Sequence, residues 1–428
     1  MKSQPMRIAF IHNAFPLLTQ TFISKEMLGL RQLGLQLQIY ALFRPQPAEL
    51  DRGFPEGQPI YYLFDGLKPL QLAAAHLLFL LKSPFRYLST ALYAHRHRDR
   101  SVSCRHIFKA FVSPKDAAKE TRQDMRLHFM LAASPAAQMS RDRVTFINSH
   151  FADAAASFAL LTARLLGLQY GVTAHAYDIF TPQANMAEKL DGARFVLTCT
   201  NFNKQTFETE FAELVVDKCR VFYHGIDTGR FQRRTRPQNS VPEILSVGRL
   251  TPKKGFPLLI SACARLRDLR IDYHCTIVGD GPQRSELNEL IAQNGLQPFV
   301  QLIGAVQSKE TQAFYERADL FALPCMIEAN GNRDGIPNVI AEAMAMELPV
   351  VSTDISGIPE LVEHEATGLL VPQNDVEALT EALRRLLQDE VLRLRMGEAG
   401  RRRVLDMFDS QTCLADLYHF YRTALRAE

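Results

Sequence analysis

Short runs of apolar residues, many of them β-branched, alternate with longer amphipathic stretches along most of the chain. Such runs predict strands buried on both faces of a parallel sheet, and the stretches between them predict helices. The strands predicted in the first half are Arg7–His12, Leu35–Phe43, Arg143–His150, Gln169–Thr173 and Phe195–Cys199. Those predicted in the second half are Glu243–Val247, Cys275–Gly279, Val300–Gly304, Ala318–Leu323, Leu348–Ser352 and Gly368–Val371. This alternation is typical of α/β domains built on a parallel sheet.

The length of the chain indicates more than one domain. A chain of 428 residues exceeds what one ordinary hydrophobic core supports, so we expect two domains. The polar stretch 228–241, which holds four arginines, has the composition of a linker. The expected domains are residues 1–235, with a helical insertion at about 67–142, and residues 236–405.

The stretch from Asp334 to Glu360 carries the most information about chemistry. Its first four residues predict a turn, because Gly335 permits a positive φ and Pro337 suits the first turn of a helix. The helix predicted next, Asn338–Met346, would present free N–H groups and a positive dipole end to an anion. Glu342, about one turn into that helix, has a carboxylate that could accept two neighbouring ribose hydroxyls.

A basic loop follows the first predicted strand of the second half. It begins at Gly248 and ends at Gly255, two residues that allow the backbone to come close to a ligand. Arg249 and Lys254 in this loop could neutralise a diphosphate. The alternative is a loop whose basic side chains are merely solvated.

Two histidines of the first half end or follow predicted strands. Ligands of parallel α/β sheets bind beyond the carboxyl ends of the strands, which is where His150 and His175 fall. A purely structural role is the alternative for each. Near the N-terminus, Thr19 or Thr21 is expected to cap a helix. This β-α-β unit lacks G-x-G-x-x-G, which argues against a nicotinamide dehydrogenase.

Composition and charge restrict the class of protein. Hydrophobic content of 47% and charged content of 22% are those of a soluble globular protein, and a net charge of +3 does not suggest nucleic acid. Seven scattered cysteines without a C-x-x-C pair indicate buried thiols in a reducing compartment. The N-terminus lacks a signal-peptide core, and no apolar run reaches the roughly 20 residues of a membrane span. We therefore expect a cytoplasmic protein.

The expected insertion differs in character from the rest of the chain. Leu70–Leu81 is apolar and is followed by a basic stretch in which Asp99 is the only acid. The basic residues are Lys82, Arg86, Arg96, Arg98, Arg100, Arg105 and Lys109. Such a combination suits peripheral docking on the anionic inner face of a membrane. A helical hairpin with solvated charges is the alternative.

Several motifs together resemble a known family. Asp334 and Glu342 are eight positions apart, which resembles the E-x7-E signature of family 4 glycosyltransferases with Asp for the first Glu. With the Pro-Val-Val-Ser-Thr and Gly-Ile-Pro-Glu-Leu-Val segments that follow, the run resembles the branch that builds bacterial exopolysaccharides, such as the colanic-acid type transferases. The basic loop resembles the family's G-R-x-x-x-x-K-G element, and Lys254 matches its lysine better than Lys253 does. The run Phe15–Ile23 resembles a turn of the same branch.

The resemblance implies a fold and an activity. The fold would be GT-B, in which two Rossmann-like parallel-sheet domains face each other across a cleft, with a C-terminal helix, 406–428, crossing back to the first domain. The activity would be retaining transfer of a sugar from a nucleotide diphosphate sugar to a lipid-linked glycan acceptor, through a front-face reaction. We expect no metal, because no D-x-D site is evident, and no cofactor.

The resemblance also assigns roles to residues. His175, Arg249, Lys254 and Asp334 would be catalytic, with Asp334 orienting sugar hydroxyls and His175 beside the transferred sugar. The donor would be bound by Arg249, Lys254, Ala305, Val306, Asp334, Gly335, Ile336, Pro337, Asn338 and Glu342. The acceptor-side candidates are Phe15, Thr19, Thr21 and His150.

Three positions depart from the family pattern: Asp334 is one methylene shorter than Glu, Cys325 replaces a usual Ser, and Glu347 replaces a usual Gly. One rival hypothesis is a catalytically silent GT-B partner subunit of a polysaccharide complex. Others are a sugar-nucleotide epimerase and a phosphorylase, although a phosphorylase would need a pyridoxal lysine site that is not evident. The nucleotide base, the sugar and the acceptor stay open.

Overall fold

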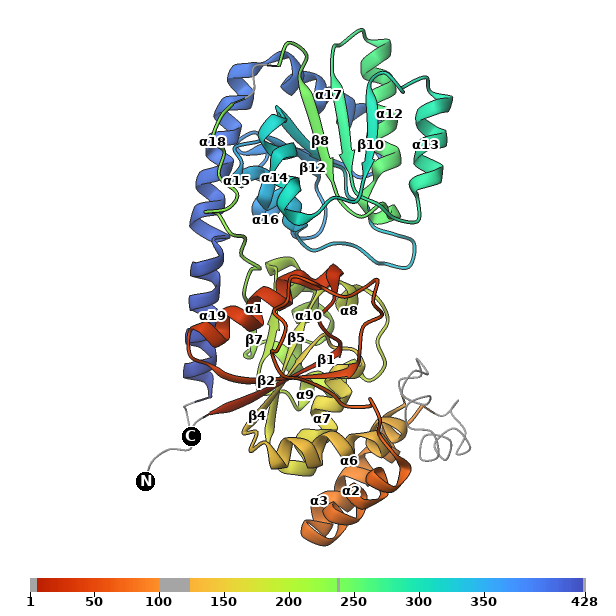
Figure 1. The fold of residues 1–428 in the computed structure, drawn as a ribbon, viewed down its shortest axis with the longest axis vertical. Coiled ribbons are helices and arrows are strands. Elements are labelled where there is room, and N and C mark those ends of the chain that lie inside the picture. The colour runs from red at the N-terminus through yellow and green to blue at the C-terminus, as the bar shows by residue number, and fades with distance from the viewer. Residues whose placement is uncertain (1–5, 100–123, 237–238, 426–428) are drawn as a thin grey trace. The chain divides into compact units, whose positions relative to one another are not determined.

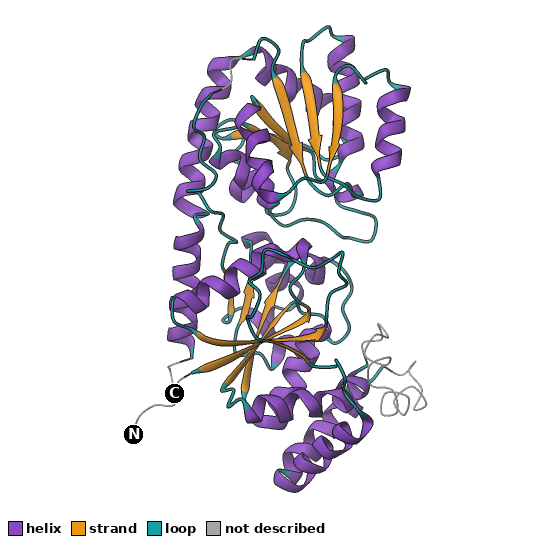
Figure 2. Cartoon of the chain, viewed as in Figure 1, coloured by secondary structure: helices purple, strands orange, loops and turns teal. Residues whose placement is uncertain are grey.

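A computed structural model shows two parallel β-sheets, each with helices on both faces (Figures 1 and 2). The structure describes residues 6–99, 124–236 and 239–425, so the predictions at Arg100, Arg105, Lys109 and residues 426–428 lie outside it. The chain divides into two compact units: residues 1–199, 204–222 and 414–428 form the first, and residues 200–203 and 223–413 form the second. The predicted fold class, two Rossmann-like parallel-sheet domains, is confirmed.

The first unit contains a seven-stranded sheet in the order β3-β2-β1-β4-β5-β6-β7. Its strands are β1 (Arg7–Ala14), β2 (Gln36–Phe43), β3 (Ile60–Tyr62), β4 (Phe146–His150), β5 (Gln169–Ala174), β6 (Val196–Thr198) and β7 (Cys219–Val221). Side chains of β1 alternate between two cores, as the period of a strand requires. Ile8 and Phe10 face the side covered by α1 (Thr21–Gln32), and Ala9 and Ile11 face the opposite side.

Helices of the first unit fall into two groups. The face opposite α1 is covered by α6 (Met125–Arg141) and α7 (Ala154–Leu166), whose inward side chains are buried in one core. Outside them lies a hairpin of α2 (Pro69–Lys82) and α3 (Pro84–Arg96). The segment expected to be an insertion thus includes α6, a helix of the domain core. The remaining helices are η1 (Leu18–Gln20), α8 (Ala176–Phe180), α9 (Met186–Asp191), α10 (Asn201–Glu210) and α11 (Ala212–Val215).

The second unit contains a six-stranded sheet in the order β10-β9-β8-β11-β12-β13. Its strands are β8 (Glu243–Val247), β9 (His274–Val278), β10 (Val300–Gly304), β11 (Leu320–Leu323), β12 (Val350–Thr353) and β13 (Gly368–Val371). Its helices are η2 (Pro252–Lys254), α12 (Phe256–Asp268), α13 (Arg284–Gln293), α14 (Ser308–Arg317), α15 (Asn338–Ala345), α16 (Ile358–Leu361), α17 (Val376–Gln388) and α18 (Glu390–Met407). Their apolar faces share one continuous core.

The boundaries of the two units along the chain differ from the expected domain boundaries. Ile226 and Phe231, which precede or begin the predicted linker, are buried in the second core. The second unit therefore begins at residue 223 instead of 236. At the other end, α19 (Ser410–Ala424) belongs to the first unit from Leu414 onward, where Tyr421 is fully buried with its ring 5.7 Å from that of Phe10.

Two further differences are local. Neither Thr19 nor Thr21 caps α1: Gln20 occupies the N-cap position without a side-chain hydrogen bond, so that prediction is wrong. β4 begins at Phe146 instead of Arg143, because Arg143 adopts a left-handed φ of 55° that ends α6. No described helix is both long and apolar enough to cross a bilayer.

Candidate active site

The strand order of the second sheet reverses between β8 and β11. The first connections lead outward on one side through β9 and β10, and later ones on the other through β12 and β13. At such a reversal the loops beyond the two central strands diverge and leave a crevice for a ligand. These loops are 248–255 after β8 and 324–337 after β11, and both contain residues predicted from the sequence.

A group of three charges joins these two loops. Lys254 Nζ lies 2.7 Å from Asp334 Oδ2, and Lys253 Nζ lies 3.0 Å from Asp334 Oδ1. The side chains of Asp334 and Lys254 are 18% and 13% exposed, so little water screens the pair. Burial raises the pKa of Asp334, but Lys254 and Lys253 lower it by more, so its pKa lies below the usual value. Burial lowers the pKa of Lys254, but Asp334 and Cys325 raise it by more, so its pKa lies above the usual value.

Glycines bring the loops of this edge close together. Gly255 has φ of +66°, and a Cβ added there would lie 1.8 Å from the carbonyl oxygen of Pro324. A Cβ on Gly279 would lie 1.9 Å from the carbonyl oxygen of Gly248. Gly255 therefore allows two loops of the protein to touch, whereas the sequence predicted that it would let the backbone come close to a ligand.

The helix α15 begins beside Asp334. Pro337 is its N-cap residue without a side-chain cap, so the N–H groups of Asn338 and Val339 have no partner within the helix. Gly335 does not use the positive φ that it could adopt. Gly335 and Pro337 are buried, and Ile336 and Asn338 are half-buried. The helix start thus offers backbone donors one short loop away from the lysines.

Glu342 is held in place by a residue that the sequence did not reveal. The hydroxyl of Tyr315, on α14, donates to Glu342 Oε2 at 3.0 Å. Tyr315 is completely buried, and burial followed by the charge of Glu342 raises the pKa of its hydroxyl well above the ordinary value. The phenol is therefore a fixed donor that orients the Glu342 carboxylate.

The other predicted donor residues lie at the same edge of the sheet. Arg249 and Ala305 are exposed, and Val306 is partly buried against the second core. Cys325, which replaces a usual Ser, is buried, and burial raises the pKa of its thiol to about 12. Glu347 does adopt a left-handed φ of 56°, the conformation that the usual Gly would favour, and pairs with Arg236 at 3.0 Å.

The first sheet also reverses, between β1 and β4, and a row of histidines lies there. His12 lies near the carboxyl end of β1 and His150 ends β4, and their rings stack with centroids 5.0 Å apart. His150 stacks in turn on His175, and His150 Nδ1 lies 3.3 Å from His175 Nε2. Burial, then the charge of His150, lowers the pKa of His12 well below the ordinary value, so His12 is neutral.

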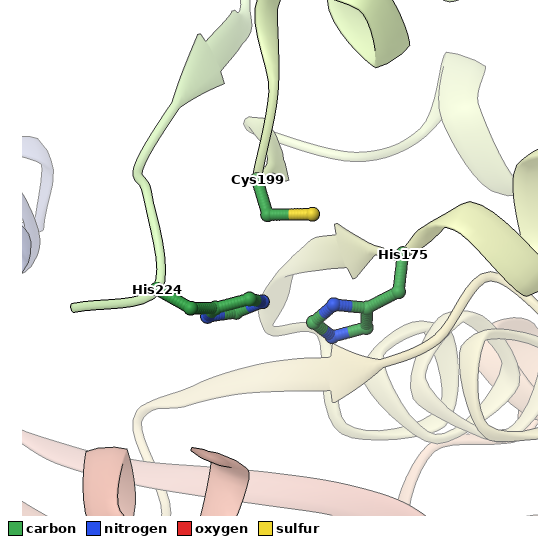
Figure 3. Close-up of side chains that lie close together, drawn as sticks. All are labelled: His175, Cys199 and His224. Atoms are coloured by element: carbon green, nitrogen blue, oxygen red, sulfur yellow. The ribbon is translucent and has the colours of Figure 1, made fainter. Parts of the chain in front are cut away.

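Glu26, on α1, extends this row. Its Oε1 lies 3.3 Å from Nε2 of the fully buried His150. A carboxylate at Nε2 favours a proton on that nitrogen, which leaves His150 Nδ1 to accept from His175. Figure 3 shows His175 and Cys199 near each other on the chain segments after β5 and β6. A ring nitrogen of His175 and Sγ of Cys199 lie within 4.8 Å of each other.

The loop that carries His175 is fixed from below by Asp178. Asp178 accepts from the backbone N–H of His175 at 2.8 Å and from the N–H of Ala152. Burial raises the pKa of Asp178 to about 8, although the Ala152 N–H lowers it. Lys189 donates to the Ala152 carbonyl at 2.9 Å. The segments after β4 and β5 are therefore tied into one rigid support.

The acceptor-side predictions fare unevenly. Phe15 is completely buried between the rings of His12 and Phe54, so its assignment to a substrate surface is wrong. Thr19 is exposed and Thr21 is half-buried, and neither belongs to the histidine row. The residues that the sequence did not single out are His12, Glu26, Lys253 and Tyr315. The position of His12 at the end of a predicted strand was the one available signal.

Residues 227–403, which include both lysines, Asp334 and Glu342, match the profile of the family described as Glycosyl transferases group 1. The second unit carries a glycosyl transferases group 1 domain. The match covers the whole edge at which the candidate donor residues gather, and the resemblance found in the sequence is confirmed.

The chain is similar in sequence to proteins named for polysaccharide biosynthesis. WcaL of Escherichia coli K12, named for colanic acid biosynthesis, is 43% identical over 168 residues, 39% of this chain and 41% of WcaL. AmsK of Erwinia amylovora, an amylovoran biosynthesis glycosyltransferase, is 41% identical over 175 residues, 41% of this chain and 43% of AmsK. These matches span less than half the length of each relative.

A solved structure extends the likeness in fold to nearly the whole chain. The Anabaena protein HepE, in complex with UDP, superposes with a TM-score of 0.68 at 15% identity and covers 98% of this chain. All of HepE is matched. At this identity the likeness establishes the fold, which is the GT-B arrangement of two Rossmann-like domains.

Proposed function

We propose that the protein is a retaining glycosyltransferase. It moves a sugar from a nucleotide diphosphate sugar to a lipid-linked glycan acceptor in bacterial surface or exopolysaccharide biosynthesis. The observation that carries the proposal is the group formed by Lys253, Lys254 and Asp334 at the strand-order reversal of the second sheet, beside the start of α15. A nucleotide diphosphate needs cations and N–H donors at such a place.

The leaving group sets the chemical task. Breaking the bond between sugar and diphosphate leaves negative charge on the diphosphate, which Lys254, Arg249 and the free N–H groups of α15 would stabilise. Because Lys254 and the N–H groups of α15 are held before the donor arrives, little reorganisation of these groups is required during the reaction. Asp334, already paired with Lys254 at 2.7 Å, would orient sugar hydroxyls beside that charge. Glu342, held by Tyr315, would accept the two ribose hydroxyls.

His175 is proposed to act on the reacting sugar. Asp334 is proposed to orient sugar hydroxyls and not to form a covalent sugar intermediate, so retention would arise by front-face transfer through an oxocarbenium-like state. The phosphate charge would be neutralised by side chains and backbone, so the reaction is proposed to need no metal and no cofactor. Retention and metal independence each have a direct test: the anomeric configuration of the product by NMR, and activity in the presence of EDTA.

The relatives support the choice of substrates. HepE was solved with UDP, and WcaL and AmsK are named for polysaccharide biosynthesis. We infer a nucleotide diphosphate sugar as donor and a growing lipid-linked glycan as acceptor. With a lipid-linked acceptor, the enzyme would work in the cytoplasm, in peripheral contact with the anionic inner membrane face.

The first test is a thermal-shift panel of UDP-, GDP- and ADP-sugars. A ligand that binds the folded state raises Tm according to its concentration over its Kd. We expect one nucleotide class to raise Tm of the wild type and to lose most of that effect in Arg249→Ala. Arg265→Ala, which removes an exposed arginine of α12 paired with Glu377, is the matched control and should respond like wild type.

The same panel, together with an assay of the products formed from the donor, separates the main alternatives. No shift with any nucleotide would overturn the donor site. A shift without sugar transfer to membrane extracts or hydrolysis of the donor would favour a silent partner subunit. Conversion of the donor to a different nucleotide sugar would favour an epimerase.

A further inference from the structure

Exposed apolar side chains are concentrated on one hairpin of the first unit. Among the described residues, sixteen large hydrophobic side chains are exposed, and seven of them lie on α2 and α3. Phe85 is 89% exposed, Leu70 80% and Leu81 72%. We call the set the apolar ridge; its members are Leu70, Leu77, Leu80, Leu81, Phe85, Leu88 and Leu92. Single exposed leucines are ordinary, but a contiguous group marks an interaction surface.

The helical period explains how the ridge arises. On α2 the side chains at Leu72, Ala75, His76 and Phe79 are buried toward the core, and the spacing i, i+3, i+4, i+7 is that of one helix face. Leu70, Leu77 and Leu81 repeat at i, i+7 and i+11 on the other face, where a helix of a soluble protein would normally carry polar residues.

The second helix continues the pattern. Thr90 and Ala94 are the buried positions of α3, whereas Phe85, Leu88 and Leu92 lie at i, i+3 and i+7 on its outer face. Figure 1 shows α2 and α3 lying side by side. Both helices therefore turn an apolar face outward, in addition to the face that each turns to the core.

The hairpin is held firmly, so the ridge is a built surface. His76 Nδ1 lies 3.0 Å from the hydroxyl of Tyr87 on α3, and His76 Nε2 lies 2.9 Å from the carbonyl of Met130 on α6. Arg86 donates to the carbonyl of Leu166, at the end of α7, at 3.1 Å. These bonds fix α2 and α3 to the domain core and leave the ridge exposed.

The charges on the hairpin segment itself are of one sign. Residues 66–98 contain five lysines and arginines and no aspartate or glutamate. Lys68 lies at the start of α2, and Lys82 and Arg86 flank Leu81 and Phe85; all three are exposed. An apolar face bordered by cations matches an anionic lipid surface, where acyl chains receive the apolar groups and headgroups receive the cations.

We propose that the α2–α3 hairpin inserts its apolar ridge into the headgroup region of an anionic bilayer. The sequence predicted docking through an apolar stretch together with the basic residues that follow it; the structure assigns the main contact to the exposed leucine and phenylalanine side chains of the ridge. The inference deepens the membrane contact in the proposed function, but it rests on the ridge and stands apart from donor binding. Lipid is the proposed occupant because the hairpin itself carries cations and no acidic residue beside its apolar side chains.

Vesicle co-sedimentation tests the proposal with the full chain. Vesicles of phosphatidylcholine alone and of phosphatidylcholine with phosphatidylglycerol are the probes. We expect binding to the anionic vesicles, and a reduction of about tenfold or more in the partition coefficient for Leu81→Asp and for Phe85→Asp. Val391→Asp on α18, at a position 76% exposed, is the matched control and should bind like wild type. Lys68→Gln with Lys82→Gln should weaken binding less, and only to anionic vesicles.

Each other outcome overturns the proposal. A protein that binds neither type of vesicle would do so, as would a Val391→Asp variant whose partition coefficient falls as much as that of the ridge variants. A dimer in light scattering without lipid, abolished by Leu81→Asp, would assign the ridge to a second copy of the chain. Binding abolished by high salt and unchanged in Phe85→Asp would assign it to charge alone. The nucleotide thermal shift, measured on the same variants, should stay as in wild type, so failure of the donor site and failure of the ridge are distinguishable.

Discussion

Lys254 Nζ lies 2.7 Å from Asp334 Oδ2, across the two loops that follow the central strands of the second sheet. The cation proposed to meet the donor diphosphate is thus already paired with the carboxylate proposed to orient the sugar. Neither side chain is free to rotate away, because each neutralises the other in a poorly hydrated place. The pair is therefore held in place before the donor binds, and the ammonium group of Lys254 is the proposed contact for the phosphates.

Replacement of Lys254 by alanine should weaken nucleoside diphosphate binding by about ten- to a hundredfold, the effect of one charge-assisted contact. Lys253→Ala should have a smaller effect, because its side chain is 25% exposed against 13% for Lys254. Isothermal titration with the nucleotide found in the shift panel measures both. Equal losses in the two variants would contradict the assignment of Lys254.

Asp334→Asn should destabilise the second unit by about 2 kcal/mol, because it leaves two lysines facing each other with little screening. The folded pKa of Asp334 lies below 3.8, so its contribution is fully present above that pH and is lost as the pH falls through the folded value. The difference from wild type in the free energy of unfolding should therefore be constant from about pH 6 to 5 and shrink below about pH 4. Urea unfolding across this range measures it; a difference that grows on acidification would contradict the pairing.

Tyr315→Phe should weaken nucleotide binding about fivefold through loss of one hydrogen bond to Glu342, worth about 1 kcal/mol. Tyr273→Phe is the matched control, because the buried Tyr273 hydroxyl donates to the Cys263 carbonyl at 2.6 Å in the same unit. Both variants should lose similar stability, and only Tyr315→Phe should change the Kd. Unchanged Kd in both would remove Glu342 from the ribose site.

Glu26→Gln should lower kcat about tenfold and leave the Kd of the donor unchanged, because Glu26 acts through His150 on the orientation of His175. The substitution keeps the size of the side chain and removes the charge that selects the tautomer. Lys25→Gln, at the exposed neighbouring position, should behave like wild type. A changed donor Kd with unchanged kcat would contradict this role.

Glu347→Gly and Glu347→Ala both remove the ion pair with Arg236, but only glycine relieves the left-handed φ of 56°. The glycine variant should therefore be more stable than the alanine variant by about 1 kcal/mol. Chemical denaturation of the two variants measures the difference. Equal stabilities would mean that the turn is not strained.

Much of the fold was available from the sequence, because the patterns that decide it are local. The segments Glu243–Val247, Val300–Gly304 and Gly368–Val371 form the predicted strands with the predicted bounds. Apolar runs between turn residues suffice there, since a strand buried on both faces needs no partner to be recognised. Motif spacing likewise placed Arg249, Lys254, Asp334 and Glu342 at one edge of one sheet.

The tertiary structure alone decided which of these residues touch. Lys254 and Asp334 are 80 positions apart in the sequence and meet only because the strand order reverses between β8 and β11. The same kind of reversal brings His12 to His150 in the first unit, where Glu26 of α1 also reaches His150. Packing against His12 and Phe54 buries Phe15 instead of exposing it to a substrate. The sequence did not predict the ridge on α2 and α3, because a leucine is equally apolar on either face of a helix. Only the packing of the other face against α6 and α7 determines which leucines stay exposed.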